Sequence, residues 1–322
     1  MRDVGEVALL EEISRLVPAR AGVIVGPGDD AAVVARSSHP LLLTTDALVE
    51  GVHFRRPWLS GWELGRRGFH VAASDVAAMG GRVRAVLLAI AAPPTWPAAE
   101  LRGVVRGVRA AAARAGGALA GGNLATAREL SLTVTVLGDA PARPVLRSGA
   151  RIGDDVWVTG SLGGAAFGLR LLLRARRLPA GETARRWWRR PVARLRAGEA
   201  LAAAGIPTAM MDLSDGLAID AGRLVRGSGR RVVIEAERLP LARCLAGLAP
   251  AAARRLALVG GEDYELLFTA APRQRAALAR LHAGVAFTRI GTVAAGRGLV
   301  VLDGAGRPLA LPRGAGHEHF RP

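Results

Sequence analysis

Acidic residues recur in one setting along this chain: directly after an apolar run and beside glycine, serine or threonine. The stretches with this arrangement are Gly28-Asp29-Asp30, Thr44-Thr45-Asp46, Ser74-Asp75, Asp212-Leu213-Ser214-Asp215-Gly216 and Gly261-Glu262-Asp263-Tyr264. Strand ends and helix starts are where α/β proteins gather ligand sites. Mg²⁺ prefers oxygen ligands, often a few carboxylates together with substrate phosphates. The pattern therefore predicts a cleft that binds several Mg²⁺ ions and a nucleotide.

Each acidic stretch also has a purely structural alternative. Gly-Asp-Asp and Ser-Asp-Gly are ordinary turn or N-cap sequences, and Ser or Asp in 212–215 is suited to capping a following helix. The combination favours the metal site, because carboxylates gathered in one cleft repel one another unless a cation lies between them. The carboxylates expected in this cleft are Asp30, Asp46, Asp75 and Asp212.

Glycine pairs form a second theme, at 80–81, 121–122, 163–164 and 260–261. The segment Gly160-Ser-Leu-Gly163-Gly164 follows a predicted strand and opens a predicted helix, a setting in which backbone N–H groups can cradle phosphate. A packing or capping role is the alternative. No Gly-x-Gly-x-x-Gly fingerprint follows a strand, so the sequence does not support a dinucleotide site.

The type of basic residue in the chain limits which catalytic mechanisms are possible. The 322-residue chain carries 44 Lys+Arg against 27 Asp+Glu, a net charge of +17, and every one of the 44 is arginine. The absence of lysine excludes Schiff-base catalysis, a P-loop lysine and the protein-kinase strand lysine. Phosphate must then be handled by metal ions, backbone N–H groups or arginine.

Other classes of protein fit the sequence less well. Nucleic-acid binding is the alternative suggested by the densest basic cluster, Arg185–Arg190, but the arginines are scattered and only 4% of residues are aromatic, so we expect no nucleic-acid partner. A single cysteine, Cys244, fits a reducing compartment. We expect no signal peptide, no membrane span and a cytoplasmic location.

Hydrophobic periodicity predicts alternating strands and helices. The predicted strands are 23–25, 31–34, 41–45, 86–91, 130–137, 156–159, 232–235, 287–293 and 299–302. The predicted helices are about 62–79, 98–115, 164–173, 192–204, 214–226 and 274–282.

These elements indicate an α/β or α+β protein of two domains. Turn formers in 138–153 mark the boundary, which gives domains of 1–140 and 148–322. The Arg/Trp-rich segment 176–191 is predicted to be a surface loop. Of the expected strands, 130–137 alternates strictly and is predicted to have one buried face.

Taken in order, the motifs resemble the thiamine-monophosphate kinase family over nearly the whole chain. The motifs that carry the resemblance are Gly-Pro-Gly-Asp-Asp-Ala-Ala (26–32), Thr-Thr-Asp-Ala-Leu-Val-Glu-Gly-Val-His-Phe (44–54), Ser-Asp-Val-Ala-Ala-Met-Gly-Gly (74–81), Gly-Gly-Asn (121–123), Arg-Ser-Gly-Ala-Arg-Ile-Gly-Asp (147–154), Val-Thr-Gly-Ser-Leu-Gly (158–163), Met-Asp-Leu-Ser-Asp-Gly-Leu (211–217), Gly-Gly-Glu-Asp-Tyr-Glu-Leu (260–266) and His-Phe (319–320). The resemblance implies phosphorylation of thiamine monophosphate by ATP to thiamine diphosphate.

The resemblance also implies a fold and a set of residue roles. The fold is similar to that of aminoimidazole ribonucleotide synthetase, with an N-terminal α/β domain that forms a homodimer through its sheet and a C-terminal α+β domain. The implied Mg²⁺ ligands are Asp30, Thr44, Thr45, Asp46, Asp75, Asn123, Asp212 and Asp215, of which Asp46, Asp75 and Asp212 are also expected to be catalytic. The implied ATP contacts are Gly122, Asn123, Arg147 and Ser214, and the implied thiamine-phosphate contacts are His53, Glu262 and His317.

Two positions differ from the pattern of the family. Asn123 stands where many members have Asp, and His317 stands where an aromatic residue is common. Relatives of the same fold remain as alternatives, but selenophosphate synthetase-like and hydrogenase-maturation enzymes use cysteines in positions that Cys244 does not match. Aminoimidazole ribonucleotide synthetase itself stays open. Because the acceptor is a phosphate that is already largely anionic, we expect direct in-line transfer without a general base or a phosphoenzyme.

Overall fold

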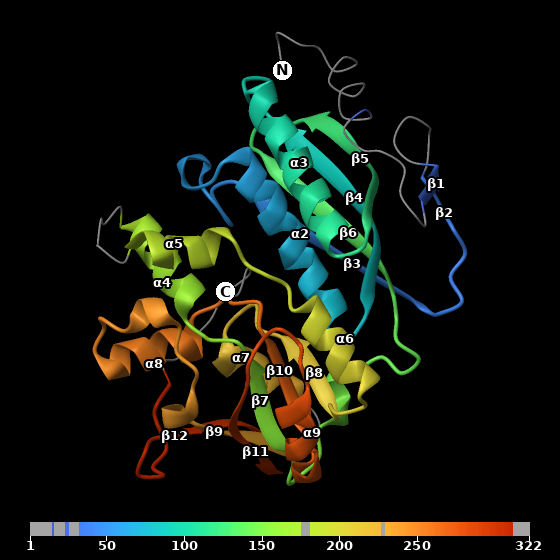
Figure 1. Cartoon of the computed structure of the whole chain (residues 1–322). Coiled ribbons are helices and arrows are strands. Elements are labelled where there is room, and N and C mark those ends of the chain that lie inside the picture. Colours follow the sequence, from blue (N-terminus) through green and yellow to red (C-terminus); the bar gives the residue numbers. More distant parts are fainter. Residues whose placement is uncertain (1–14, 16–22, 26–31, 175–180, 227–228, 312–322) are drawn as a thin grey trace. The chain divides into compact units, whose positions relative to one another are not determined.

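The chain divides into two compact units, each built around its own sheet. Unit 1 contains residues 1–76 and 81–142, and unit 2 contains residues 77–80 and 143–322. The computed structural model describes residues 15, 23–25, 32–174, 181–226 and 229–311 (Figure 1). The predicted residues Asp30 and His317 lie outside the described residues.

Unit 1 is organised by a four-stranded sheet in the order β3-β6-β4-β5. Its strands are β3 (Leu41–Val49), β4 (Arg82–Ala92), β5 (Ala118–Thr126) and β6 (Ser131–Asp139). β6 pairs antiparallel with both β3 and β4, whereas β5 pairs parallel with β4. A short pair of strands, β1 (Val23–Val25) and β2 (Val33–Val34), accompanies this sheet.

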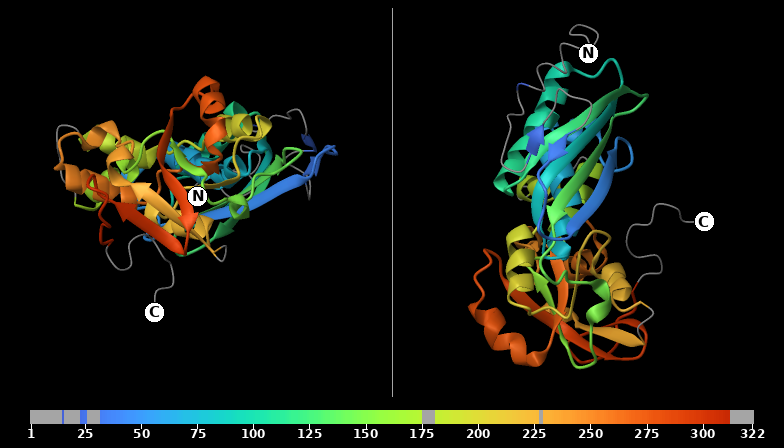
Figure 2. Two further views of the ribbon diagram at one scale, coloured as in Figure 1. Left: turned by 90° about the horizontal axis from the view of Figure 1, so that it is seen from below. Right: turned by 90° about the vertical axis from the view of Figure 1, so that its right-hand side faces the viewer.

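Two helices cover one face of the unit 1 sheet (Figures 1 and 2). They are α2 (Gly61–Ala78) and α3 (Ala98–Arg114), and they pack closely because Gly65 lets α2 approach the backbone of Val104. The alternation predicted for 130–137 is confirmed in β6, where Leu132, Val134 and Val136 are buried. The opposite face of the sheet leaves large hydrophobic side chains exposed, at Leu41, Leu43 and Leu87.

Unit 2 contains a six-stranded sheet in the order β12-β9-β11-β7-β10-β8. Its strands are β7 (Asp155–Thr159), β8 (Ala209–Asp212), β9 (Arg230–Glu235), β10 (Leu266–Ala270), β11 (Phe287–Ala295) and β12 (Gly298–Leu302). All neighbours pair antiparallel except β12 and β9, which are parallel. The helices are α4 (Gly164–Leu173), α5 (Gly181–Arg189), α6 (Leu195–Ala203), α7 (Leu217–Leu224), α8 (Pro250–Val259) and α9 (Arg275–Arg280).

Short 3-10 helices complete the described structure. They are η1 (Arg56–Trp58), η2 (Arg147–Gly149), η3 (Ala236–Arg238), η4 (Arg243–Leu245) and η5 (Pro272–Gln274).

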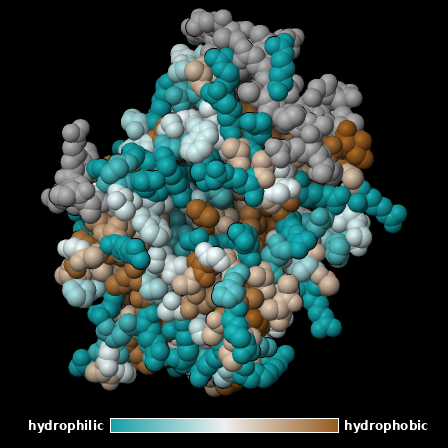
Figure 3. Space-filling model, viewed as in Figure 1, coloured by the Kyte–Doolittle hydropathy of each residue, from teal (hydrophilic) through white to brown (hydrophobic). Residues whose placement is uncertain are grey.

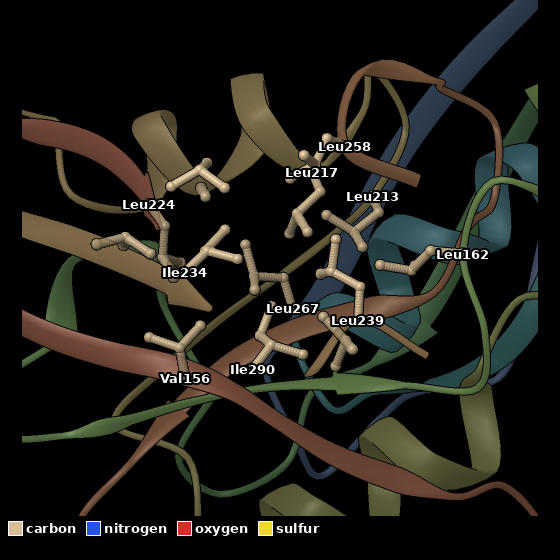
Figure 4. Close-up of a cluster of buried hydrophobic side chains, with 14 of the residues drawn as sticks. Val156, Leu162, Leu213, Leu217, Leu224, Ile234, Leu239, Leu258, Leu267 and Ile290 are labelled. Carbon is tan, nitrogen blue, oxygen red and sulfur yellow. The ribbon is translucent and has the colours of Figure 1, made fainter. Parts of the chain in front are cut away.

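Within the unit 2 sheet, β8 and β10 are buried on both faces. On one face, Leu267 of β10 meets Leu217 and Leu224 of α7 and Leu258 of α8 in a cluster of inward-pointing side chains (Figure 4). On the other face, Phe268 of β10 belongs to a second buried cluster. Burial on both sides explains why the whole of β10 is apolar except for Thr269.

The predicted elements are largely confirmed, with one error and several omissions. The segment 176–191 was predicted to be a surface loop, but its described part forms α5, whose Ala184 and Trp188 are buried. This prediction is wrong because the spacing of these two residues places them on one helix face, and packing of that face outweighs the many arginines. Besides α5 and the short 3-10 helices, the described elements that the sequence did not predict are β5, β8, β10 and α8.

Hydrophilic residues are distributed over the surface of the protein, as the scattered arginines of the sequence suggest. On the face shown in Figure 3, hydrophilic residues are spread widely instead of gathering in one region. Among the described residues, no helix is both long and apolar enough to span a membrane.

Candidate functional site

In unit 1, the structure brings together the predicted carboxylates of β3 and α2. The alternation of β3 directs Thr44 and Asp46 toward the helix-covered face of the sheet, and the Thr44 hydroxyl donates a hydrogen bond of 2.6 Å to Oδ2 of Asp75. Burial, and then the negative charge of Asp75, raise the pKa of Asp46 to about 6. The carboxylate of Asp75 therefore lies close enough to Asp46 to oppose the ionisation of Asp46.

This pair suits a hard divalent cation. Both carboxylates and the neighbouring hydroxyl offer oxygen ligands, which Mg²⁺ prefers, and a cation between Asp46 and Asp75 would remove their mutual repulsion. Within the described part of the chain, no group of three or more His, Cys, Asp or Glu side chains forms a complete metal cage. Mg²⁺ commonly takes only one or two protein carboxylates and completes its shell with water and phosphate oxygens.

Two other predicted metal residues of unit 1 lie on the opposite face of the sheet. The Thr45 hydroxyl lies 3.0 Å from that of Thr135, on the face that α2 and α3 leave open. Asn123 shares this open face, since it pairs with Ala89 in the row that also contains Ala47. β3 and β5 are separated by three strand spacings, about 14 Å, so one chain does not bring the side chain of Asn123 to Asp46.

The remaining unit 1 residues have distinct local roles. Gly122 lies in the row of Leu88, Val134 and Asp46, and a side chain at this position would collide with the carbonyl of Leu88. Nδ1 of His53 accepts a hydrogen bond of 3.1 Å from the N–H of Val49. An accepting Nδ1 places the proton of the neutral ring on Nε2.

In unit 2, backbone hydrogen bonds gather several predicted residues beside the end of β8. Asp212 ends this strand and is buried. The N–H of Glu262 donates to the carbonyl of Ser214 at 2.7 Å, which ties the segment 260–265 to the turn after β8. The N–H of Met210 donates to the carbonyl of Leu146 at 3.1 Å, so the exposed Arg147 lies alongside the same strand.

Asp215 is engaged by an arginine of the following helix. Arg223 donates from Nη1 to both Asp215 and Asp220. The carboxylate of Asp220 also accepts the N–H groups of Asp215 and Gly216, each at 3.1 Å, so Asp220 caps the start of α7. Burial and the neighbouring Asp215 raise the pKa of Asp220 to about 6. The sequence did not single out Asp220, whose only signal is an acid in the first helical turn.

The predicted phosphate cradle of 160–164 is already occupied by the chain. Oδ2 of Asp263 accepts the N–H of Gly163 at 2.6 Å, and Oδ1 accepts the N–H of Ala165 at 3.1 Å. The interpretation of this segment as a phosphate site is therefore wrong, although its physical basis holds: the start of α4 does bind an anion, and the anion is an internal carboxylate. Burial raises the pKa of Asp263 to about 7.

Glu262 stands in a strained turn and is bound by a residue that the sequence did not identify. Its φ angle is +70° and that of Tyr264 is +50°, and these are the positive values among the described non-glycine residues. Nε1 of Trp188 donates to Oε2 of Glu262. The Arg185–Arg190 cluster thus directs one of its two tryptophans inward, while Trp187 packs across Gly164. Trp188 is buried and Trp187 is partly buried, so both tryptophans pack within unit 2.

Comparison with known proteins identifies the family of the two domains. Residues 28–140 and 151–304 match the models of the N-terminal and C-terminal domains of the AIR synthase related protein. Thiamine-monophosphate kinase of Mycobacterium tuberculosis is 35% identical over 275 residues, which are 83% of this chain and 81% of that protein. These matches confirm the two-domain aminoimidazole ribonucleotide synthetase-like fold.

Two solved structures are similar over nearly the full length. Thiamine-monophosphate kinase from Stenotrophomonas maltophilia K279a is 35% identical with a TM-score of 0.83, over 92% of this chain and 96% of that chain. AaThiL complexed with AMPPCP and TMP is 33% identical with a TM-score of 0.76, over 99% of this chain and 98% of that chain.

Proposed function

Because the chain belongs to the thiamine-monophosphate kinase family, we propose that it transfers the γ-phosphoryl group of ATP directly to thiamine monophosphate, with Mg²⁺ at the Asp46–Asp75 pair. The reaction of this family is ATP-dependent phosphorylation of thiamine monophosphate to thiamine diphosphate. The observation that carries the mechanism is the close approach of two carboxylates, one of which has a raised pKa.

Repulsion between anions is the main barrier to this reaction. The acceptor phosphate has a second pKa of about 6, so its oxygen is largely anionic at neutral pH and needs no general base. Bound Mg²⁺ would supply the positive charge that screens the two phosphate groups and orients them. Asp46 and Asp75 would hold that charge, and the hydrogen bond from Thr44 would fix the orientation of Asp75.

The other residue roles are part of the same proposal. Additional Mg²⁺ ligands would come from Asp30, Thr45, Asn123, Asp212 and Asp215. ATP would contact Gly122, Asn123, Arg147 and Ser214, and thiamine monophosphate would contact His53, Glu262 and His317. Because the Thr45 side chain faces away from Asp75, its contribution at this site would come from the backbone carbonyl. Asp215 would share its charge between metal and Arg223.

We also propose a homodimer through the open face of the unit 1 sheet. That face exposes Leu41, Leu43 and Leu87 at 54%, 73% and 45%, beside the threonines of β3 and β6. Apolar residues gathered on an uncovered sheet face favour association with a second copy. A cytoplasmic location belongs to the proposal too, since a chain with a single cysteine forms no internal disulfide, which fits a reducing compartment.

The decisive experiment replaces Asp46 with Asn. With ATP, Mg²⁺ and thiamine monophosphate, we expect Asp46→Asn to lower kcat by about 10²–10³-fold, because it removes a charge that acts where phosphate charge must be neutralised. The matched control is Glu129→Gln, an exposed carboxylate of unit 1 without a proposed role. Near-normal turnover of Asp46→Asn at low Mg²⁺ would refute the metal site. Labelling of the protein by γ-³²P-ATP without acceptor would refute direct transfer.

A further inference from the structure

We propose that Trp188 is a positioning residue for substrate recognition: its indole N–H holds the carboxylate of Glu262 in place to bind the thiamine moiety. The inference rests on the proposed role of Glu262. It assigns a function to the Arg/Trp-rich segment, which neither the metal site nor the ATP contacts explain.

The hydrogen bond joins the protein core to a carboxylate at its boundary. The side chain of Trp188 is fully buried, whereas Glu262 is only partly buried. Nε1 of Trp188 donates to Oε2 of Glu262. A rigid indole with two side-chain torsions fixes a partner at little entropic cost, so this bond selects one orientation of a flexible glutamate.

Helices α4 and α5 bind neighbouring residues of the segment 260–265, which is called the acidic loop below. Asp263 binds the N–H groups of Gly163 and Ala165 at the start of α4, and the preceding residue, Glu262, is bound by α5. Gly168 lets α4 approach the backbone of α5 so closely that a side chain there would collide with the carbonyl of Ala184. The two helices therefore form one firm support for the loop.

The backbone of the loop indicates that the placement of Glu262 matters beyond packing. A positive φ costs a non-glycine residue free energy, and such residues cluster at ligand sites when the surroundings impose them. Here Glu262 has a φ of +70°, and the chain returns to the sheet through Tyr264, with a φ of +50°. Backbone hydrogen bonds to Ser214 and Leu213 stabilise both residues in these conformations.

The ligand chemistry suits a fixed carboxylate. The thiamine moiety combines a cationic thiazolium ring with a pyrimidine ring that bears an amino group, and both attract a negatively charged acceptor. A carboxylate that accepts a hydrogen bond from a rigid donor presents its charge in a defined direction. ATP has no cationic ring, and Glu262 is not among its proposed contacts, so the effect of Trp188 should be confined to the thiamine substrate.

The test compares Trp188→Phe with Trp187→Phe. The first variant retains an aromatic ring but loses the N–H group, and the second makes the same change at the neighbouring residue that packs across Gly164. Steady-state kinetics would be measured for each substrate. We expect Trp188→Phe to raise the KM for thiamine monophosphate about tenfold, the effect of losing a hydrogen bond to a charged group, while the KM for ATP stays within about twofold. Trp187→Phe should change neither.

Variants of Glu262 separate this inference from the role on which it rests. Glu262→Gln should raise the KM for thiamine monophosphate, and adding Trp188→Phe to it should have little further effect. Glu262→Asp keeps the charge but shortens the side chain, so it should weaken thiamine monophosphate binding as well. If Glu262→Gln has a normal KM, the role of Glu262 fails. If Glu262→Gln is impaired but Trp188→Phe matches Trp187→Phe, or Glu262→Asp behaves as wild type, the positioning role of Trp188 is overturned.

Discussion

Asp263 should make the protein less stable as the pH rises toward neutrality. Its carboxylate is buried at the start of α4, and burial, together with the nearby Glu265 and Glu262, raises its pKa to about 7 despite the two N–H donors of Gly163 and Ala165. In the unfolded chain an aspartate loses its proton near pH 4. Between these two values the folded protein holds a proton that the unfolded chain has released.

The sign and size of the effect follow from this difference in proton binding. A group whose pKa is raised on folding favours the folded state fully below pH 4, and this advantage is lost as the pH rises through 7. The free energy of unfolding then falls by about 1.4 kcal/mol per pH unit wherever only the folded state is protonated. From pH 5.5 to pH 8 the loss amounts to about 2 kcal/mol for a pKa of 7.

Urea unfolding of the wild type and of Asp263→Asn at several pH values measures this loss. The amide of the variant takes up and releases no proton in this range, so the stability of the variant should fall less steeply with pH. Asp303→Asn is the matched control: hydrogen bonds from Arg307 lower the pKa of Asp303, so this group is ionised over the whole range and its loss should not alter the slope. Parallel curves for wild type and Asp263→Asn would refute the reasoning.

Two further substitutions test the supporting structure. Arg194→Met should destabilise the protein by about 3–5 kcal/mol in thermal or urea unfolding, because it leaves the buried carboxylate of Glu265 without its bidentate partner, and adding Glu265→Gln should restore part of the loss. Leu43→Glu should convert a dimer into a monomer in sedimentation velocity while changing the stability of the fold by no more than about 0.5 kcal/mol, since Leu43 is 73% exposed in the single chain. A dimer that survives this change would argue against the open sheet face as the interface.

Hydrophobic periodicity predicted the strands and helices that have a regular apolar pattern. It did not predict elements in which functional or closely packed residues interrupt that pattern. The alternation over 130–137 was enough to predict β6. The strand predicted at 41–45 continues to Val49, because Asp46 keeps the alternation of β3 while breaking its apolar run. β5 was not predicted since it contains Gly121 and Gly122, which are poor strand formers, yet Gly122 is needed where β5 passes the carbonyl of Leu88.

The sequence predicted which residue types form the candidate site, but not on which face of the unit 1 sheet each of them lies. The expectation that Asp46 and Asp75 lie close together agrees with the structure, but Asp46 lies within β3 and Asp75 in the last turn of α2, rather than at a strand end and a helix start. Which side of a sheet a residue occupies depends on strand register, which a single sequence does not reveal at β5. Thr45 lies opposite Asp46 because neighbouring residues of a strand alternate, whereas the face of Asn123 depends on the register of β5. A shared site would require backbone atoms or a second chain.

The acidic loop shows why a family motif can be diagnostic without every residue touching substrate. In a chain with a net charge of +17, three carboxylates stand within four positions, and each has its own partner. Glu262 binds Trp188, Asp263 binds the start of α4, and Glu265 binds Thr159 and Arg194. The last two fix the loop on either side of a strained Tyr264, so their loss would shift Glu262 through the backbone. A defect in thiamine monophosphate binding after substitution of Asp263 or Glu265 is therefore expected from geometry alone, and only Glu262 needs a direct contact with the ligand.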